Sequence, residues 1–346
     1  MSRVLVAMSG GVDSSVAAAL LQEQGHDVVG ATMKLWGGTS DSGCCSVADV
    51  EDARRVAQQL GIVHHVFNFT DDFDRHVVGP YVDAHARGRT PNPCVECNRH
   101  LKFDRFLDRA LQLGFDAIAT GHHARVDAAG HLCRGADRAK DQSYVLSMLA
   151  PAQLNRLHLP VGELTKDEVR AVAARAGLRT AAKPDSQDVC FILSEGGRSA
   201  FLGDRIPLRA GTVVDRAGNR LGTVPAVELV TVGQRRGLGT SGGLGRKAFV
   251  VDVDVERATV VVGPEDALAV DTIAVEQQTW ASADGAVAAG THVDVQASAH
   301  GTPFGAVYES DGVLRLDRPQ RRPAPGQTVA LYDGDRVLGG GVVTGV

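Results

Sequence analysis

The chain has 346 residues, of which 44% are hydrophobic and 22% are charged, and its formal net charge is −5. This length suits two or three domains that each bury a core, and no apolar stretch approaches the roughly 18 residues of a membrane-spanning helix. The composition therefore argues against a membrane-spanning protein and favours a soluble, multidomain one.

Residues 1–195 alternate between predicted strands and predicted helices. We expect strands at Val4–Met8, Val28–Thr32, Val63–Phe69 and Ala117–Thr120, and helices at Ser14–Gln24, Val50–Leu60 and Leu101–Leu113. Ser46 with Asp49, and Thr165 with Glu168, have the spacing of capping boxes, which would open the second helix and a fourth one. Strand–helix alternation at this spacing predicts an α/β domain with a doubly wound parallel sheet.

After residue 195 the pattern changes to short Val-rich runs broken by Gly and Asp. Residues 196–266 are expected to form a small β-rich domain, with strands at Thr212–Val214, Arg220–Leu221, Phe249–Val253 and Thr259–Val262. Residues 267–346 add β runs at Val293–Ala297, Ala306–Glu309, Val313–Leu316, Thr328–Leu331 and Val337–Val343. The pairs Asp311-Gly312 and Asp333-Gly334 are typical of hairpin turns, so we predict a closed or nearly closed C-terminal β-barrel.

A glycine- and serine-rich segment, Ser9–Ser15, joins the first predicted strand to the first predicted helix. Gly10 and Gly11 let the backbone approach phosphate oxygens, the serine hydroxyls add donors, and Asp13 can hold Mg²⁺. The segment lacks the Gly-Lys-Ser end of a Walker loop, so cleavage between the α and β phosphates fits better than γ-phosphate transfer. The simpler alternative is a turn that caps the helix. The segment resembles the PP-loop of the ATP pyrophosphatases, which activate an oxygen by adenylation.

The chain begins with a strand pattern rather than a signal peptide, so we expect a cytoplasmic protein. Its six cysteines are then not expected to form a structural disulfide framework. Cys44, Cys45 and Cys133 have no paired His at metal-ligand spacing, and we expect them to be structural.

Cys94 and Cys97 follow a Pro-x-Pro turn where a helix is expected to begin, and Cys190 lies in the polar segment Asp185–Ile192. A thiol near a helix start, followed by basic residues, should have a lowered pKa and act as a nucleophile. On local sequence alone, Cys97 and Cys190 could also be ordinary core residues.

Positive charge is clustered although the chain is acidic overall. One cluster contains Arg235, Arg236, Arg246 and Lys247, and the other contains Arg315, Arg318, Arg321 and Arg322. Such clusters either bind RNA phosphates or form a solvated face without a partner.

Further motifs narrow the resemblance. They are Met33–Trp36, Thr90–Asn98, Thr120–Ala124, Lys140–Tyr144, Asp185–Ile192, Gly233–Gly239 and Pro325–Gln327. Together they resemble the tRNA-specific 2-thiouridylase family over nearly the whole chain. The resemblance implies a sheet of the adenine-nucleotide alpha-hydrolase type and thiolation of the wobble uridine of tRNA. ATP would adenylate the uridine 2-oxygen, and sulfur from a cysteine persulfide would then displace AMP.

The resemblance also assigns roles to positions in this sequence. The ATP site would contain Ala7, Met8, Ser9, Gly10, Gly11, Val12, Asp13, Ser14, Met33 and Gly121. The target base would meet Asn92, Pro93 and Cys94, and the rest of the tRNA would meet His122, Lys140, Asp141, Gln142 and Gln327. Cys97 would be the nucleophile and Cys190 the persulfide carrier, with a disulfide between them after transfer.

The implied cofactors are ATP and Mg²⁺, and the implied partners are tRNA and a protein that donates persulfide sulfur. We expect no membrane partner and a monomeric chain. An iron–sulfur cluster on Cys94, Cys97 and Cys190 is an alternative that we disfavour, because two thiols suffice for transfer and resolution. Two departures stand out: Cys94 replaces an Asp of many family members, and the family's barrel arginine pair is absent at Gln296–His300.

Two other functions remain open on the residues alone. One is another PP-loop adenylating synthetase, which would need neither three cysteines nor a basic C-terminal half. The other is a non-catalytic, nucleotide-dependent RNA-binding module whose cysteines hold a structural metal. Pyrophosphate release that requires both ATP and tRNA would distinguish the three.

Overall fold

The N-terminal part of the chain is built on a five-stranded parallel sheet in the order β3-β2-β1-β4-β7. The structure is a computed structural model that describes every residue except 37–45, 186–188, 193–195, 240–246, 283–284 and 346. The strands are β1 (Arg3–Ala7), β2 (Asp27–Lys34), β3 (His64–Asn68), β4 (Ala117–Ala119) and β7 (Leu157–His158). In the central strand β1, consecutive aliphatic residues are needed because both faces of the sheet are covered.

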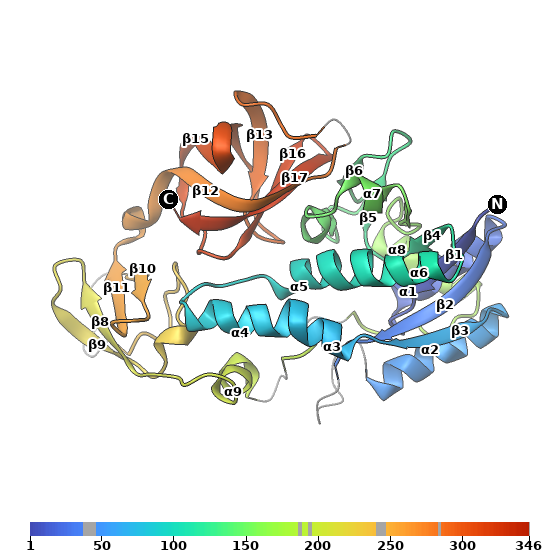
Figure 1. Cartoon of the computed structure of the whole chain (residues 1–346), viewed down its shortest axis with the longest axis horizontal. Coiled ribbons are helices and arrows are strands. Elements are labelled where there is room, and N and C mark those ends of the chain that lie inside the picture. The colour runs from blue at the N-terminus through green and yellow to red at the C-terminus, as the bar shows by residue number, and fades with distance from the viewer. Residues whose placement is uncertain (37–45, 186–188, 193–195, 240–246, 283–284, 346) are drawn as a thin grey trace.

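Helices cover both faces of this sheet (Figure 1). Val4 and Val6 of β1 pack in one apolar cluster with side chains from α1 (Val12–Glu23), α2 (Val47–Leu60) and α8 (Lys166–Arg175). Leu5, between them, packs in a second cluster with side chains from η2 (Cys97–Arg105) and α6 (Phe106–Gln112). Alternate residues of one strand therefore enter two cores, and the predicted doubly wound parallel sheet is confirmed.

The predicted helix caps are present in α2 and α8. Ser46 Oγ accepts a hydrogen bond from the Asp49 amide at 3.1 Å. Thr165 Oγ1 accepts one from the Glu168 amide, and the Glu168 carboxylate reaches back to the Thr165 amide at 2.7 Å. These side chains satisfy amides that the first helical turn leaves without a partner, so the helices begin at these positions.

Two long helical segments lie side by side next to the sheet (Figure 1). The first runs through α3 (Thr70–Phe73), η1 (Asp74–Val78) and α4 (Gly79–Ala86), and was not predicted. The second runs through α5 (Pro93–Glu96), η2 and α6, so the helix predicted at Leu101–Leu113 in fact begins at Pro93. Both η1 and η2 are π-helical, a geometry that is rare and often found at functional sites.

The smaller elements of this part lie after β4. They are the hairpin β5 (Ala124–Val126) and β6 (Leu132–Arg134), η3 (Ser143–Leu146), α7 (Pro151–Leu154) and α9 (Gly197–Gly203). No helix among the described residues combines the length and apolar character needed to cross a bilayer.

The central unit is a four-stranded sheet in the order β10-β11-β8-β9. Its strands are β8 (Gly211–Asp215), β9 (Arg220–Val224), β10 (Phe249–Asp254) and β11 (Thr259–Gly263), with short helices η4 (Val227–Leu229) and η5 (Glu265–Leu268). All four strands lie where the sequence predicted them. Val213, Val250 and Val260 are fully buried in its own small core.

The C-terminal unit is a closed antiparallel barrel of six strands, since β12 pairs with both β15 and β17. The strands are β12 (Ala269–Trp280), β13 (Thr291–Gln296), β14 (Phe304–Tyr308), β15 (Val313–Arg321), β16 (Thr328–Asp333) and β17 (Arg336–Gly345), with η6 (Ser310–Gly312) before β15. The predicted barrel is confirmed, and it includes one strand, β12, that was not predicted. The hairpin β5–β6 joins the barrel sheet through Cys133 and Arg336, so the first and last parts of the chain share a sheet.

Candidate active site

The glycine- and serine-rich loop lies between β1 and α1, where the parallel strands end. Ser9 donates its amide to Ser14 Oγ at 3.2 Å, and Ser15 Oγ donates to the Gly11 carbonyl at 2.7 Å. Gly10 has a φ of +74°, and a Cβ there would overlap the Asp49 carbonyl oxygen. Gly11 is the N-cap of α1 and has no side-chain cap. The loop therefore presents backbone donors of a helix start, as an anion site requires.

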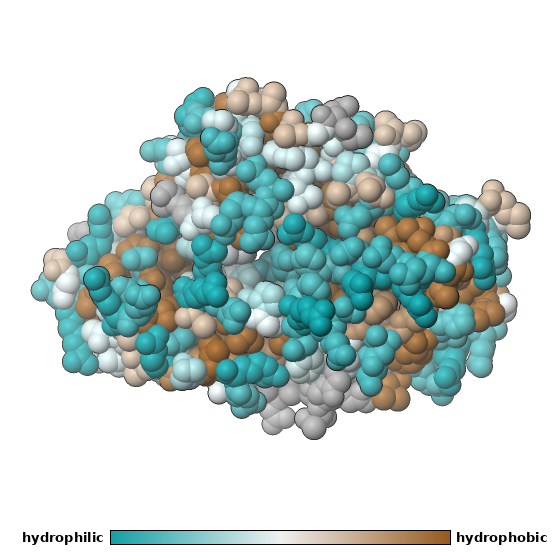
Figure 2. All heavy atoms as spheres, in the orientation of Figure 1, coloured by the Kyte–Doolittle hydropathy of each residue, from teal (hydrophilic) through white to brown (hydrophobic). Residues whose placement is uncertain are grey.

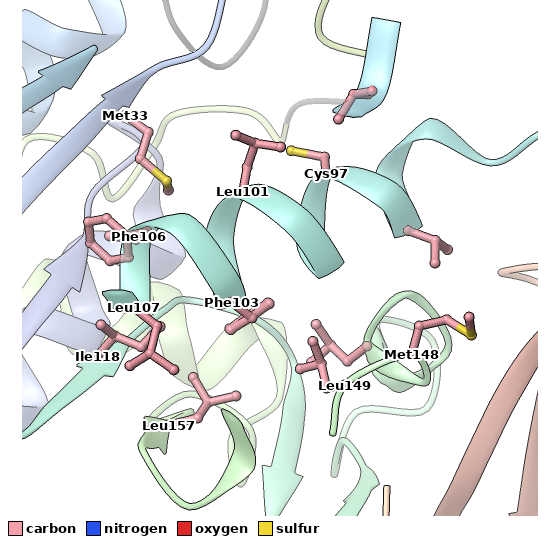
Figure 3. Close-up of a cluster of buried hydrophobic side chains, with 14 of the residues drawn as sticks. Met33, Cys97, Leu101, Phe103, Phe106, Leu107, Ile118, Met148, Leu149 and Leu157 are labelled. Carbon is pink, nitrogen blue, oxygen red and sulfur yellow. The ribbon is translucent and has the colours of Figure 1, made fainter. Parts of the chain in front are cut away.

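Gly121 brings the segment after β4 against this loop. A Cβ on Gly121 would lie 2.5 Å from the Ser14 nitrogen, so only glycine permits the approach. Met33, at the end of β2, is 9% exposed and packs in the apolar cluster that also contains Cys97 (Figure 3). The residues expected at the ATP site are thus contributed by three adjacent strands.

Asp13, in the first turn of α1, is held by two cationic or polar partners. Lys166 Nζ contacts its two carboxylate oxygens at 2.7 and 2.8 Å, and His123 Nε2 lies 3.2 Å from Oδ1. Burial raises the pKa of Asp13, but the hydrogen bonds from His123 and Lys166 outweigh it, so the pKa lies below the ordinary value. Asp13 is therefore an ionised carboxylate at the loop.

Lys166 also contacts a second carboxylate, that of Asp185, at 2.7 Å. Asp185 accepts from Lys140 at 2.8 Å and from Arg170 at 3.1 Å as well. Burial raises the pKa of Asp185, but the hydrogen bonds from Lys140 and Lys166 lower it by more. The pKa of Asp185 is therefore about 2, below its ordinary value. The sequence predicted no role for Lys166, Arg170 or Asp185, because no local signal marks a lysine at the start of a capped helix as part of a site.

The thiols expected to act lie around the start of η2. Asn92 caps α5 by accepting from the amides of Cys94 and Val95 at 3.1 and 3.4 Å. Cys94 is exposed, whereas Cys97 is 7% exposed and lies on the same side of its helix as Leu101 (Figure 3). Cys190 is partly buried and packs against the same apolar cluster as Cys97. Both thiols therefore border the same large apolar cluster.

The residues expected to contact tRNA have different exposures. Gln142 is exposed and the Lys140 side chain is 40% exposed. Asp141 is only 7% exposed in its side chain and accepts from Arg134, Gly135 and Ser143. In this structure Asp141 thus holds its neighbours rather than facing solvent.

His122 is also buried. Its Nδ1 lies 2.7 Å from Thr120 Oγ1, and burial, with the nearby charges of Lys102 and His123, holds the pKa of His122 well below its ordinary value. Gln327 donates to the Thr90 carbonyl at 2.8 Å, and the Thr90 amide donates to the Pro325 carbonyl at 2.8 Å. These bonds dock the barrel on the segment just before Asn92.

The surface near this segment is hollowed between the barrel and helices α4 and α5, and hydrophilic residues border the hollow (Figure 2). α5, which carries Cys94, lies beside it.

Other predicted features have mixed outcomes. Among the residues that the structure describes, no three His, Cys, Asp or Glu side chains are grouped so that they could hold a metal ion, and this applies to Cys94, Cys97 and Cys190. Cys133 is partly buried on β6, and burial together with Asp127 raises its pKa. Cys44, Cys45 and Arg246 lie outside the described residues.

Family comparisons match the chain along nearly all of its length. Three family models match: a tRNA methyl transferase HUP domain at residues 2–194, a tRNA methyl transferase PRC-barrel domain at 199–264, and an aminomethyltransferase beta-barrel domain at 270–343. The tRNA-specific 2-thiouridylase MnmA of Chloroflexus aggregans is 48% identical over 99% of this chain and 98% of its own length. That of Mycobacteroides abscessus is also 48% identical, over 99% of both chains.

A solved structure that matches part of the chain is NMN synthetase from Francisella tularensis. It is 16% identical with a TM-score of 0.34, and the match covers 54% of this chain and 66% of that one. A similarity of this degree carries no argument about function.

Proposed function

The chain belongs to the tRNA-specific 2-thiouridylase family, and from this we propose that it uses ATP to replace the 2-oxygen of a uridine in tRNA by sulfur. The observation that carries the proposal is 48% identity over 99% of this chain to relatives of that name. The family models carry a methyl transferase name, but methyl transfer to RNA needs neither a pyrophosphate-binding loop nor a pair of thiols. We take the wobble uridine as the target, as the resemblance implies.

ATP is proposed to bind at the Ser9–Ser14 loop with Gly121 and Met33 beside it. Mg²⁺ typically binds through one or two carboxylates together with substrate phosphates. Asp13 fits this need, because it is a single ionised carboxylate, 30% exposed, at the start of α1. When bound there, the ion would neutralise phosphate charge as pyrophosphate departs.

Cys190 and Cys97 are proposed to transfer the sulfur. The outer sulfur of a Cys190 persulfide attacks C2 of the adenylated uridine, and AMP leaves with the former 2-oxygen. The Cys97 thiolate then attacks Cys190 Sγ, which breaks the bond to the transferred sulfur and leaves 2-thiouridine and a Cys97–Cys190 disulfide. A cellular thiol must reduce this disulfide before a donor protein reloads Cys190.

For tRNA binding we propose that Asn92, Pro93 and Cys94 meet the target base and that Lys140 and Gln142 meet the flanking backbone. His122, Asp141 and Gln327 are proposed to act in tRNA recognition from less exposed positions, by fixing the segments that carry the exposed residues. We further propose that the chain acts as a monomer in the cytoplasm. Its three domains are proposed to span residues 1–195, 196–266 and 267–346.

The test is mass spectrometry of tRNA nucleosides from cells that lack the protein, combined with pyrophosphate release by the purified chain. Loss of 2-thiouridine, together with pyrophosphate release that requires both ATP and tRNA, is expected. Pyrophosphate release without tRNA would favour another adenylating synthetase, and tRNA binding without pyrophosphate release would favour a non-catalytic RNA-binding protein.

A further inference from the structure

The ammonium of Lys166 lies between the nucleotide loop and the segment that leads to Cys190. Lys166 is the first residue of α8, and its side chain is only 11% exposed. Nζ contacts Asp13 at 2.7 and 2.8 Å and Asp185 at 2.7 Å. The two contacts with Asp13 are hydrogen bonds and the contact with Asp185 is an ion pair, so one ammonium serves both carboxylates.

The segment that contains Asp185 is also held by ion pairs between Lys183 and helix α2. Lys183 contacts Asp49 and Asp52 of α2 at 2.7 and 2.8 Å. Arg170, one turn after Lys166 on α8, contacts Asp185 but not Asp13, and it also donates to the carbonyls of Ala181 and Lys183. Lys166 therefore contacts both the loop and the segment, whereas the contacts given for Arg170 in the described part of the chain are with the segment.

Sharing one ammonium makes the two carboxylates interdependent. A phosphate oxygen that accepts from Lys166 competes with these two carboxylates for the same ammonium. If a cation draws Asp13 toward the nucleotide, Lys166 is left with Asp185. In either case, ligand binding at the loop changes how strongly Lys166 attracts Asp185. By thermodynamic linkage, a displacement of Asp185 then changes the affinity of the loop for its ligand.

We propose that Lys166 is a positioning residue that couples nucleotide binding at the Ser9–Ser14 loop to the segment that carries Cys190. The inference rests on the proposed function, which identifies the nucleotide as ATP and Cys190 as the sulfur carrier. The effect of Lys166 on Cys190 is proposed to pass through Asp185, which Lys166 contacts directly.

Two readouts that need no turnover test the coupling in the full-length chain. One is the affinity for a non-hydrolysable ATP analogue. The other is the rate at which iodoacetamide alkylates Cys190, followed by peptide mass spectrometry with and without the analogue. In the wild type the analogue is expected to change the Cys190 rate. Because neither readout requires thiolation, a failed activity assay and a failed coupling are separate results.

Lys166→Met should weaken analogue binding by roughly 5- to 150-fold, the usual range for coupled sites, and remove the response of Cys190 to the analogue. Arg170→Met is the matched control, because Arg170 contacts Asp185 but not Asp13: it should change the basal Cys190 rate, keep the response of Cys190 to the analogue, and weaken analogue binding less than Lys166→Met does. Lys166→Arg should restore part of both properties, because the charge is kept.

If Lys166→Met does not fold cooperatively, Asp185→Asn replaces it, since this variant keeps the contact between Lys166 and Asp13. It should bind the analogue, while Cys190 no longer responds. The proposal is overturned if Lys166→Met binds the analogue normally, if Cys190 in the wild type does not respond to the analogue, or if it still responds in Asp185→Asn.

Discussion

Cys94 and Cys97 lie one helical turn apart, but their surroundings differ. Cys94 is exposed, whereas Cys97 is 7% exposed inside the apolar cluster. Cys190 packs on the same cluster as Cys97. A thiol that must form a disulfide within the protein is well placed in an apolar cluster on which its partner also packs, and an exposed thiol is well placed to meet substrate.

We therefore predict that Cys190→Ser loses all thiolation but still releases pyrophosphate when ATP and tRNA are present. Cys94→Ser should retain part of the thiolation activity, and Cys133→Ser, the control, should retain nearly all of it. The measurements are pyrophosphate release and 2-thiouridine formation with a persulfide donor.

The cluster alternative predicts a different pattern for the same variants. The cluster alternative would be supported if the wild type, prepared without oxygen, contained stoichiometric iron and if both Cys94→Ser and Cys190→Ser lost the iron and the activity. Non-reducing peptide mapping after one turnover decides further, because the persulfide route requires a Cys97–Cys190 linkage, whose Cα atoms must approach to about 4.4–6.8 Å.

At the scale of elements, the loop between β1 and α1 uses its two glycines for different purposes. Gly10 is needed for packing, because its φ is +74° and a Cβ would overlap the Asp49 carbonyl oxygen. Gly11 has an ordinary φ of −89°, and the nearest atom to an added Cβ is Ser9 Oγ at 3.5 Å. The unliganded loop thus has room for a methyl group at Gly11, and only a ligand would need that space.

Accordingly, Gly11→Ala should leave the thermal unfolding temperature nearly unchanged but weaken ATP binding strongly, whereas Gly10→Ala should lower the unfolding temperature. Gly203→Ala is the control, because its Cβ would lie 3.4 Å from Leu208 in an ordinary contact far along the chain. Calorimetric unfolding and equilibrium ATP binding check this. A Gly11→Ala protein that binds ATP normally would show that phosphates do not approach the backbone there.

For the whole molecule, the interfaces between units determine the functional surface. The two basic clusters meet across one of them: Arg235 and Lys247 of the central unit and Arg321 of β15 line a single cavity of about 370 Å³ together with Glu265. Arg321 also lies over the Phe249 ring. Positive charge from two units is therefore concentrated at their junction.

This junction is expected to contact tRNA phosphates. Replacing Arg235 and Arg236 by Ala should weaken tRNA binding and reduce the slope of log affinity against log salt by about one unit for each phosphate that the protein no longer neutralises. Arg257→Ala is the control, because that side chain is 85% exposed elsewhere in the central unit. Unchanged affinity and slope would mean that the cluster is only a solvated face.

A second interface, between α4 and η4, should make stability depend on pH. His85 is 2% exposed, and its Nδ1 lies 3.3 Å from the Glu228 carbonyl. Burial, followed by the charge of Arg198, lowers its pKa from 6.5 to about 4. The unfolded chain therefore binds this proton at higher pH than the folded one, so the free energy of unfolding falls as pH decreases from 6.5 to about 4.

The difference corresponds to at most about 3 kcal/mol. Urea unfolding across this pH range should show the decrease in the wild type and a smaller decrease in His85→Gln, which cannot take up the proton. Because His122 is buried in both proteins, its contribution cancels in the comparison. Identical pH dependence in the two proteins would contradict the assignment.

The amino-acid sequence by itself determined what depends on neighbours along the chain. The aliphatic run at Val4–Val6, the caps at Ser46 and Thr165 and the turn at Asp311-Gly312 are local patterns, and each element formed there. The nucleotide loop was recognisable for the same reason. Helix α3–α4 was not predicted, although its buried residues Phe73, Val77 and Tyr81 recur at the four-residue spacing of a helix.

Only the tertiary structure decided which distant side chains meet. Lys166 contacts Asp13 and Asp185, Gln327 contacts Thr90, and Arg321 lines one cavity with Arg235, yet none of these pairs is close in sequence. The burial of Asp141 likewise follows from packing of β6 and the barrel around it. Such contacts depend on how whole helices and sheets pack, because a side chain's partners across a core are set by the surfaces that bury it and not by its own neighbours in the chain.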